Sequence, residues 1–162
     1  MKNHIRYDTA KFPRLNLPAC NFKVRREDDG CVRLWDTLRK VWLVLTPEEW
    51  VRQHVLGMLM QGMSIPPALI SQECPVCLNG MPQRADIVVY GKDSSPLMLV
   101  ECKAPDVAIT PAVYAQAVRY NTVLGARYLF LTNGLQHRIY EQTGEEYRIM
   151  EVMPDLSGSA GI

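Results

Sequence analysis

Three residues on two neighbouring stretches of the chain have the types and spacing needed to bind a divalent cation. Asp86 opens one apolar run, and Glu101 and Lys103 close the next. Side chains alternate between the faces of a strand, so Glu101 and Lys103 point to one side and Cys102 to the other. Four apolar residues, 97–100, precede Glu101. Ionised groups at the end of such a buried strand cost several kcal/mol unless they are paired or bind a metal.

A turn at residues 91–96 brings Asp86 beside Glu101. Residues that face each other on antiparallel strands have Cβ atoms about 5 Å apart, so both carboxylates can share one cation. Mg²⁺ takes oxygen ligands in an octahedron at roughly 2.0–2.1 Å and keeps several waters, so two carboxylates and one carbonyl suffice. We expect the backbone carbonyl of Cys102 to be the third ligand, and Mn²⁺ to substitute for Mg²⁺. From these residues alone, a buried ion network of Asp86, Glu101 and Lys103 is an equal alternative.

The elements that position these residues are marked by capping and turn residues. Thr46 is a suitable N-cap, with Pro47 at the first helical position, so a helix is predicted to run from there to Gln61. A β-hairpin is predicted from Val32 to Leu45, and a second helix from Pro111 to Gly125.

The remaining segments have the alternation and turns of strands. An antiparallel meander is predicted over 69–76, 84–90 and 97–103, a buried strand over 127–132, and a final edge hairpin over 137–152. This order predicts an α/β protein of the mixed α+β type, with a central mixed sheet flanked by helices. We expect an N-terminal arm at 1–30, one domain at 31–153 and a flexible tail at 154–162.

Composition excludes several classes of protein. The 162 residues, 48% of them hydrophobic and 22% charged, fit one globular domain, and no long apolar segment predicts a membrane span or a leader. The expected location is therefore the cytoplasm. The five cysteines form an odd set and predict free thiols; Cys74 and Cys77 alone form a CxxC, a weak indication of zinc. Residues 1–45 hold ten Lys or Arg and five Asp or Glu, a net +5 that suits phosphates or a solvated surface.

The pattern of Asp86 followed by Glu101-Cys102-Lys103 resembles the PD-(D/E)xK signature of restriction and repair nucleases, with Ala85 in place of the leading proline. The chain is more closely similar to the domain at the N-terminus of type I restriction enzyme R subunits. That similarity covers about residues 40–140 and is carried, in order, by TPEEWVRQ, RADIVVY, ECKAP, QAVRYN and YLFLTNG. It implies a restriction-endonuclease-like fold.

The resemblance also implies roles for individual residues. Asp86 and Glu101 correspond to metal ligands, and Lys103 to the catalytic base or charge stabiliser. An acid of the first helix, Glu49 or else Glu48, corresponds to an accessory metal-site group. On the second helix, Gln116 corresponds to a catalytic residue that points toward the metal or the nucleic acid. The expected nucleic-acid contacts are Arg84, Arg119 and Tyr120.

These expectations lead to a Mg²⁺-dependent nuclease that acts on DNA. The alternative is a catalytically silent module that binds DNA or a protein partner, and a weaker one is a zinc-dependent interaction domain. No P-loop is present, so we expect a motor or specificity subunit to act in trans. A homodimer is also a possible partner arrangement, because two copies of the chain would supply one active site for each strand of a DNA duplex.

Overall fold

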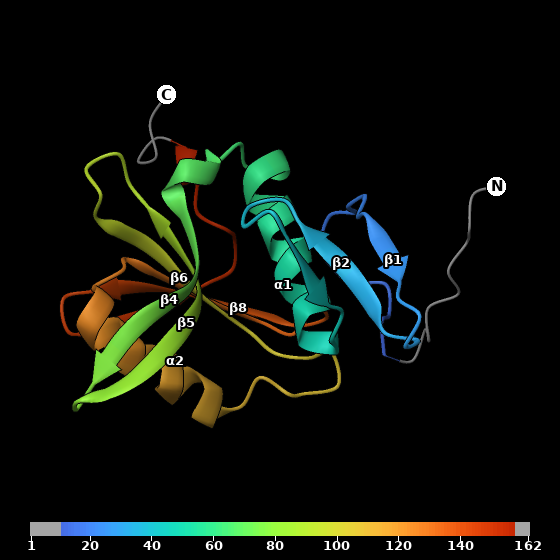
Figure 1. The fold of residues 1–162 in the computed structure, drawn as a ribbon. Helices are drawn as coiled ribbons and strands as arrows, with labels where there is room; N and C mark the ends of the chain where they lie inside the picture. The colour runs from blue at the N-terminus through green and yellow to red at the C-terminus, as the bar shows by residue number, and fades with distance from the viewer. Residues whose placement is uncertain (1–10, 158–162) are drawn as a thin grey trace.

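The computed structural model describes residues 11–157, in which α1 lies between a small sheet and a main sheet (Figure 1). The small sheet is antiparallel and has the order β1-β2-β3. Its strands are β1 (Val24–Arg26), β2 (Val32–Asp36) and β3 (Val41–Val44). The predicted hairpin is β2–β3 and is confirmed. The three-residue β1 was not predicted, because it lies in the segment assigned to an arm.

The main sheet has the strand order β4-β5-β6-β7-β8-β9. Its strands are β4 (Ile70–Leu78), β5 (Met81–Tyr90), β6 (Pro96–Cys102), β7 (Tyr128–Thr132), β8 (His137–Thr143) and β9 (Glu146–Met150). Neighbours are antiparallel except β6 and β7, which are parallel. The predicted meander, buried strand and edge hairpin are therefore confirmed, and the sheet is mixed.

Helix α1 (Pro47–Gly57) begins where the sequence predicts it to begin. The Thr46 side chain accepts a hydrogen bond from the backbone N–H of Glu49, which caps the helix. A π-helical turn, η1 (Met58–Gly62), continues it, and a 3₁₀ turn, η2 (Pro67–Leu69), leads into β4. Val51 and Val55 are fully buried, so this side of the helix faces the core.

Helix α2 (Pro111–Leu124) is capped by Thr110 and ends at Gly125, whose φ of 70° is left-handed and favours glycine. The two helices cover opposite faces of the main sheet. Val51 of α1 packs in one cluster with Ile87 of β5, whereas Ala117 of α2 packs in another with Val88 of β5. Consecutive residues of one strand therefore serve two cores, as alternation requires.

The segments at both ends of the described chain pack against this body. Leu15 is buried, and the Asn16 backbone N–H donates to the Gly134 carbonyl at 2.7 Å. At the other end Pro154 and Leu156 are buried, and Leu156 belongs to the core on the α1 side. The predicted flexible tail is thus wrong for residues 154–157, because Leu156 fills that core. Residues 158–162 lie outside the described part of the chain. No helix within residues 11–157 is long and apolar enough to span a membrane.

Candidate functional site

Asp86 and Glu101 come together on adjacent strands, as the sequence predicts. Ile87 of β5 pairs with Val100 of β6, and continuing that register by one residue places Asp86 opposite Glu101. The Cys102 backbone N–H donates to Asp86 Oδ2 at 2.7 Å and fixes the orientation of this carboxylate. The turn at 91–96 and β-alternation are sufficient to bring the two acids to one place.

Glu101 is a buried acid with an unused ligand atom. Its side chain belongs to a residue that is only 3% exposed, and its Oε1 has no hydrogen-bond partner. Burial, which is the largest cause, and the neighbouring Asp86 carboxylate together raise the pKa of Glu101 to about 9, although Lys103 lowers it. A carboxyl group whose pKa is raised by burial and by another carboxylate is a candidate for a functional site.

Lys103 lies directly after β6 and reaches α2. Its Nζ is 3.4 Å from Gln116 Oε1, and Gln116 Nε2 donates to the Tyr120 hydroxyl at 2.9 Å. That hydroxyl donates in turn to Gln83 Oε1 of β5 at 3.2 Å. Tyr120, which was expected to contact nucleic acid, is only 4% exposed, because its ring packs in the core between α2 and the sheet. Its ring is closed to a base, and its hydroxyl orients Gln116.

Arg52 of α1 is the central cation of the site, and sequence reasoning did not identify it. Its Nη2 donates to Asp86 Oδ1 at 2.9 Å, and its Nη1 donates to Glu49 Oε2 at 2.7 Å. The residue is 7% exposed. Arg52 stands three residues after Glu49, one helical turn away, and this spacing was the only available signal. A buried guanidinium thus links the acids of α1 to the strand carboxylate.

The two acids at the first turn of α1 have different surroundings. Glu49 is buried, and its Oε1 accepts a hydrogen bond from Gln53 at 2.9 Å. The Glu48 side chain is 44% exposed and lies 3.3 Å from Arg52 Nη2. Burial raises the pKa of Glu48, Asp86 raises it further, and Arg52 and Lys103 lower it. Of the two candidates, Glu48 is therefore the acid on the open side of the site, and Glu49 is the internal partner of Arg52.

A second set of polar side chains connects the site to the small sheet. Asp36, at the end of β2, is fully buried. Its carboxylate accepts five hydrogen bonds, from the backbone N–H groups of Leu38 and Arg39 and from the side chains of Arg39, Gln53 and Gln72. Burial alone would raise the pKa of Asp36, but these bonds outweigh it and hold the pKa below its usual value. Asp36 thereby joins the β2–β3 turn to α1 and β4.

Arg39 extends this connection to the acids. Its Nη1 donates to Glu73 Oε2 at 3.0 Å, and its Nη2 lies 3.8 Å from Glu49 Oε1. Glu73 has a left-handed φ of 47° within β4 and also lies 3.7 Å from Arg52 Nη1. Because such a conformation is strained for a non-glycine residue, the surrounding ion pairs must hold it in place. Glu73 and Arg39 were not identified from the sequence.

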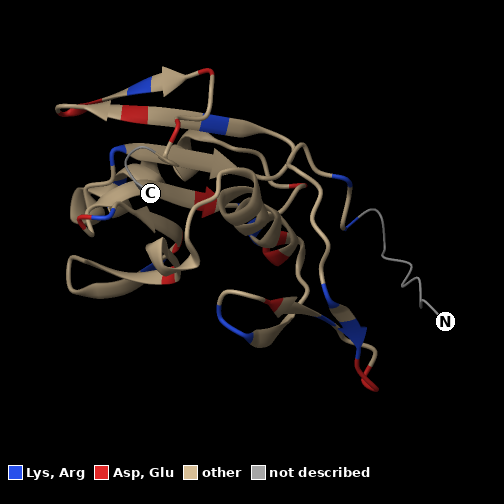
Figure 2. Cartoon of the chain, turned by 90° about the horizontal axis from the view of Figure 1, so that it is seen from above, with Lys and Arg blue, Asp and Glu red and all other residues tan. Residues whose placement is uncertain are grey.

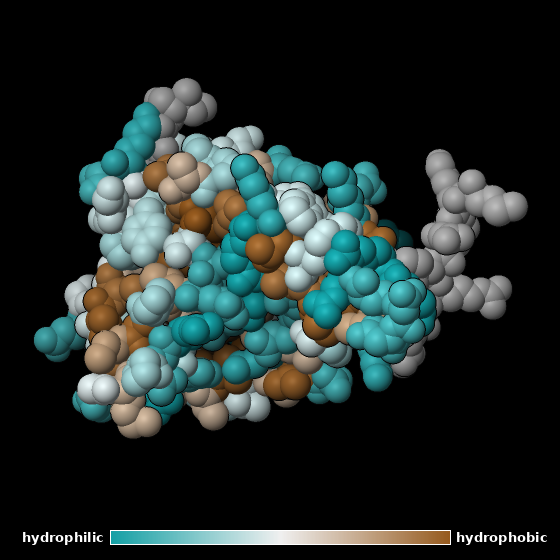
Figure 3. Space-filling view, in the orientation of Figure 1, coloured by the Kyte–Doolittle hydropathy of each residue, from teal (hydrophilic) through white to brown (hydrophobic). Residues whose placement is uncertain are grey.

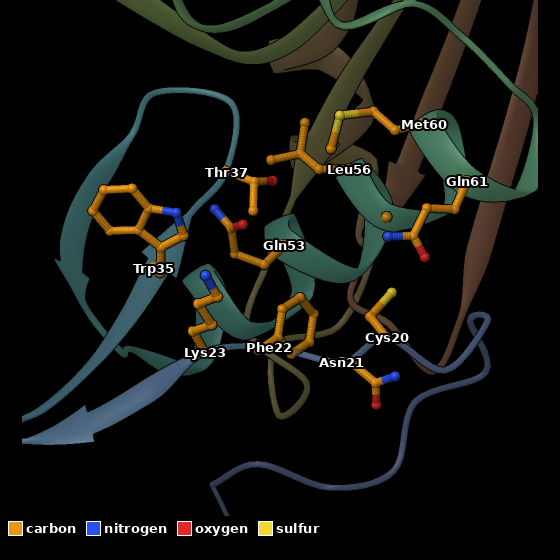
Figure 4. Close-up of a pocket in the computed structure, with 11 residues that line it drawn as sticks. Cys20, Asn21, Phe22, Lys23, Trp35, Thr37, Gln53, Leu56, Met60 and Gln61 are labelled. Carbon is orange, nitrogen blue, oxygen red and sulfur yellow. The ribbon is translucent and has the colours of Figure 1, made fainter.

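A small cavity of about 110 Å³ lies beside these groups, between α1, the turn after β2 and the segment 20–23 (Figure 4). Gln53 extends from α1 toward Thr37 in this view. The same amide binds Asp36 and Glu49, so this cavity adjoins the site without opening onto the Asp86–Glu101 pair.

The remaining predicted nucleic-acid contacts are exposed. The Arg84 side chain is 71% exposed and lies 3.7 Å from Glu73, and Arg119 is exposed on α2. An open pocket of about 280 Å³ is lined by Arg119 together with Gln116, Tyr120 and Gln83. The side chains that orient Lys103 therefore also border a space that solvent can enter.

The carboxylates suit a hard cation, but they do not form a ready-made cage. Within residues 11–157, no group of three His, Cys, Asp or Glu side chains is arranged to hold a metal ion. Arg52 stands between Glu49 and Asp86, which explains why the three predicted acids do not converge. The unpartnered Oε1 of Glu101 and the adjacent Asp86 nevertheless offer the oxygen donors that Mg²⁺ prefers. This part of the donor set fits the ion.

The CxxC gives no comparable site. Cys74 is buried and Cys77 is exposed, and both are free thiols. Four thiolate or imidazole ligands are usual for structural zinc. No such set lies around Cys74 in the part of the chain that is described.

Comparison with known proteins gives one finding. A family model described as the N-terminus of type I restriction enzyme R protein matches residues 47–156. This stretch runs from the start of α1 to the buried Leu156 and contains every residue of the site except Asp36 and Arg39. No curated protein matches the chain.

Proposed function

Because the chain belongs to the type I restriction enzyme R protein N-terminal family, we propose that it is a Mg²⁺-dependent nuclease that hydrolyses phosphodiester bonds in DNA. Family membership supports a role related to restriction, and the site supports the chemistry. The observation that carries the proposal is the buried Glu101 oxygen without a partner, next to the Asp86 carboxylate. Most buried polar atoms in folded proteins have a hydrogen-bond partner, so an unpartnered carboxylate oxygen supports a ligand at this position.

The ion would be held by Asp86 and Glu101, with the Cys102 carbonyl as the further proposed ligand and Glu48 or Glu49 as an accessory acid. When bound, Mg²⁺ supplies Lewis-acid activation of a phosphate oxygen and of water. The protein holds its own groups ready for that chemistry. The Cys102 N–H fixes Asp86, and Gln116, itself held by Tyr120, positions the Lys103 ammonium.

Lys103 acts in this proposal as a charge stabiliser. Its ammonium would offset the negative charge that develops on the phosphate. Arg84 and Arg119 are exposed and would bind flanking phosphates through charge alone. A motor or specificity subunit in trans, and a second copy of the chain, belong to the same proposal.

The proposal predicts Mg²⁺- or Mn²⁺-dependent cleavage of plasmid or oligonucleotide DNA that depends on two residues. Asp86→Asn should abolish ion uptake, measured by calorimetry, and Lys103→Met should reduce the cleavage rate about 100-fold or more while ion uptake persists. Asp93→Asn and Lys92→Met, on the exposed β5–β6 turn, are matched controls that should cleave normally. Cleavage that survives both site substitutions would overturn the assignment.

A second candidate is a module with the same fold that binds DNA or a protein partner without cleaving. It is favoured by one observation, the guanidinium of Arg52 that occupies Asp86 Oδ1. Calorimetry separates the two functions. Absence of Mg²⁺ and Mn²⁺ uptake, together with stoichiometric DNA binding, supports the silent module and contradicts the nuclease.

A further inference from the structure

The small sheet has an outer face that the proposed catalytic chemistry does not use. Along β2, Leu34 and Asp36 are fully buried, and Asp36 binds Gln53 of α1. Since side chains alternate along a strand, Arg33 and Trp35 lie on the face opposite Leu34 and Asp36. At one edge of this face, Trp35 also lines the small cavity beside Gln53 of α1. Both are half-buried rather than enclosed.

Strand pairing gathers two indole rings on this outer face. Trp42 of β3 lies opposite Trp35 of β2, and their ring centroids are 5.4 Å apart. Arg25 of β1 lies opposite Arg33, and its guanidinium carbon is 4.2 Å from the centroid of the Trp42 ring. A cation–π contact of this kind keeps the guanidinium over one face of the Trp42 ring, while its Nε pairs with Glu27.

The charges on this face are mainly positive. Lys23, two residues before Arg25, is exposed on the same side. Glu27 is the acid among these cations, with its Oε1 2.7 Å from Arg25 Nε and 3.5 Å from Arg33 Nε. Figure 2 shows Lys and Arg along the small sheet, with acidic residues at its outer turn. Three cations against one acid leave a net positive face that suits phosphates.

The side of the small sheet visible in Figure 3 is mainly hydrophilic. An apolar docking surface for another protein would show a contiguous hydrophobic patch instead. The two indoles pack edge to face, and Arg25 covers one face of Trp42. Aromatic rings together with cations bind a chain that has both π-faces and phosphates, which is a single strand of nucleic acid. A duplex keeps the faces of its bases stacked on one another, so it could use the cations but not the rings.

We propose that Lys23, Arg25, Arg33, Trp35 and Trp42 form a platform that binds single-stranded nucleic acid, with bases on the indoles and phosphates on the cations. Only the role of the bound strand, as the substrate or as the strand displaced from a duplex, rests on the proposed function. The β2–β3 turn supplies the physical connection, because Arg39 within it contacts Glu49 and Glu73 of the site. Glu27 is the internal anion that a phosphate would displace.

The test measures binding in EDTA, where cleavage cannot occur. Fluorescently labelled oligo(dT), an abasic oligonucleotide of equal length and a duplex are titrated with the intact chain and followed by anisotropy. We expect oligo(dT) to bind at least about 10-fold more tightly than the abasic strand, because stacking on one aromatic side chain contributes 5-fold or more per base, on the order of 1–3 kcal/mol. Equal affinity for the two strands would overturn the proposal.

Substitutions identify the face. Trp42→Ala should lower the affinity for oligo(dT) about 10-fold and leave the affinity for the abasic strand unchanged. Arg33→Gln, which keeps both indole rings, should lower the affinity for both oligo(dT) and the abasic oligonucleotide. It should also reduce the slope of log affinity against log salt by about 0.7. Glu27→Gln should raise the affinity for both oligonucleotides, because it removes the acid among the cations. Lys92→Gln, on the β5–β6 turn, is the control. Unchanged binding by Trp42→Ala and Arg33→Gln would place any nucleic-acid contact elsewhere.

The outcome is independent of the proposed nuclease. If the platform binds oligo(dT) as expected but no DNA is cleaved in Mg²⁺ or Mn²⁺, the platform stands and the proposed function fails. If DNA is cleaved but Trp42→Ala cleaves single-stranded oligonucleotides as well as the unaltered protein does, the platform is wrong and the nuclease stands.

Discussion

At the scale of single residues, the site is a set of acids around one buried arginine. Arg52 contacts Asp86, Glu49 and Glu48, so it supplies positive charge where the proposed ion would also lie. A guanidinium is always charged and cannot leave by losing a proton. Any cation that binds Asp86 therefore has to share this carboxylate with Arg52 or displace it.

Removal of Arg52 should make the fold depend on divalent cations. Arg52→Met removes the buried positive charge that binds Asp86 and Glu49 at 2.9 and 2.7 Å. We expect a loss of roughly 3–5 kcal/mol in the free energy of unfolding in EDTA, measured by urea denaturation. Mg²⁺ should restore part of it and raise the melting temperature more than in the unaltered protein. Arg84 is exposed and lies 3.7 Å from Glu73, as Arg52 does. Arg84→Met should therefore change stability by less than about 0.5 kcal/mol. Full stability of Arg52→Met in EDTA would contradict this role.

The charge state of Glu101 should make metal-free stability depend on pH. With a pKa of about 9 in the folded protein and about 4.5 as the ordinary value, Glu101 binds a proton in the folded state that the unfolded state releases. Stability in EDTA therefore falls as pH rises from about 5 to 9. Glu101→Gln should flatten this slope in thermal melts across that range, whereas Glu146→Gln at the exposed start of β9 should not. Parallel curves for the unaltered protein and Glu101→Gln would refute the assignment.

At the scale of secondary-structure elements, the carboxylate of Asp36 connects the small sheet to the elements that carry the site. Asp36 ends β2 and binds Gln53 of α1 and Gln72 of β4. The same turn carries Arg39 to Glu73. The hairpin is consequently part of the framework that positions Glu49, even though the family match begins only at residue 47.

Loss of the Asp36 charge should loosen this framework. Asp36→Asn removes the charge that Arg39 Nε binds in a buried place and turns an amide N–H group toward other donors. We therefore expect roughly 3–5 kcal/mol of destabilisation in urea denaturation. Because hydrogen bonds hold the pKa of Asp36 below its usual value, its contribution is present at neutral pH and disappears as the pH falls through that lowered pKa. Asp106→Asn, at an exposed position, is the control. An unchanged urea midpoint for Asp36→Asn would show that the hydrogen bonds of Asp36 do not stabilise the fold.

At the scale of the whole molecule, the ordered body extends beyond the last strand. Leu156 is fully buried in the cluster that includes Val51, Val55 and Phe130, six residues after β9 ends. Figure 1 shows the segment after β9 returning toward the turn that precedes β4. The C-terminal segment thus closes the core on the α1 side.

Truncation of this anchor should therefore cost stability. Leu156→Ala creates a cavity in a packed core, and we expect about 2–5 kcal/mol of destabilisation by urea denaturation. Val152→Ala, at a residue 73% exposed, should lie within about 0.5 kcal/mol of the unaltered protein. Equal midpoints for the two variants would instead support a boundary at residue 153.

The sequence by itself determined the elements and the central pair of acids. Thr46-Pro47 and Thr110-Pro111 begin helices through local capping, and Gly125 ends one through its left-handed backbone. Asp86 faces Glu101 because one short turn joins two alternating strands, so the pairing needs no information from distant parts of the chain. Local chemistry was sufficient in each case.

Only the tertiary structure decided which groups surround those acids. Arg52 meets Asp86 across 34 residues of sequence, and Arg39 meets Glu73 across the same separation. The packing of α1 against both sheets selects these partners. The local sequence around each arginine does not distinguish them from the other acidic residues of the chain. Burial likewise decided that Tyr120 faces the core, that Glu101 has a raised pKa and that Leu156 is an anchor, because burial is a property of the assembled layers and of no single segment.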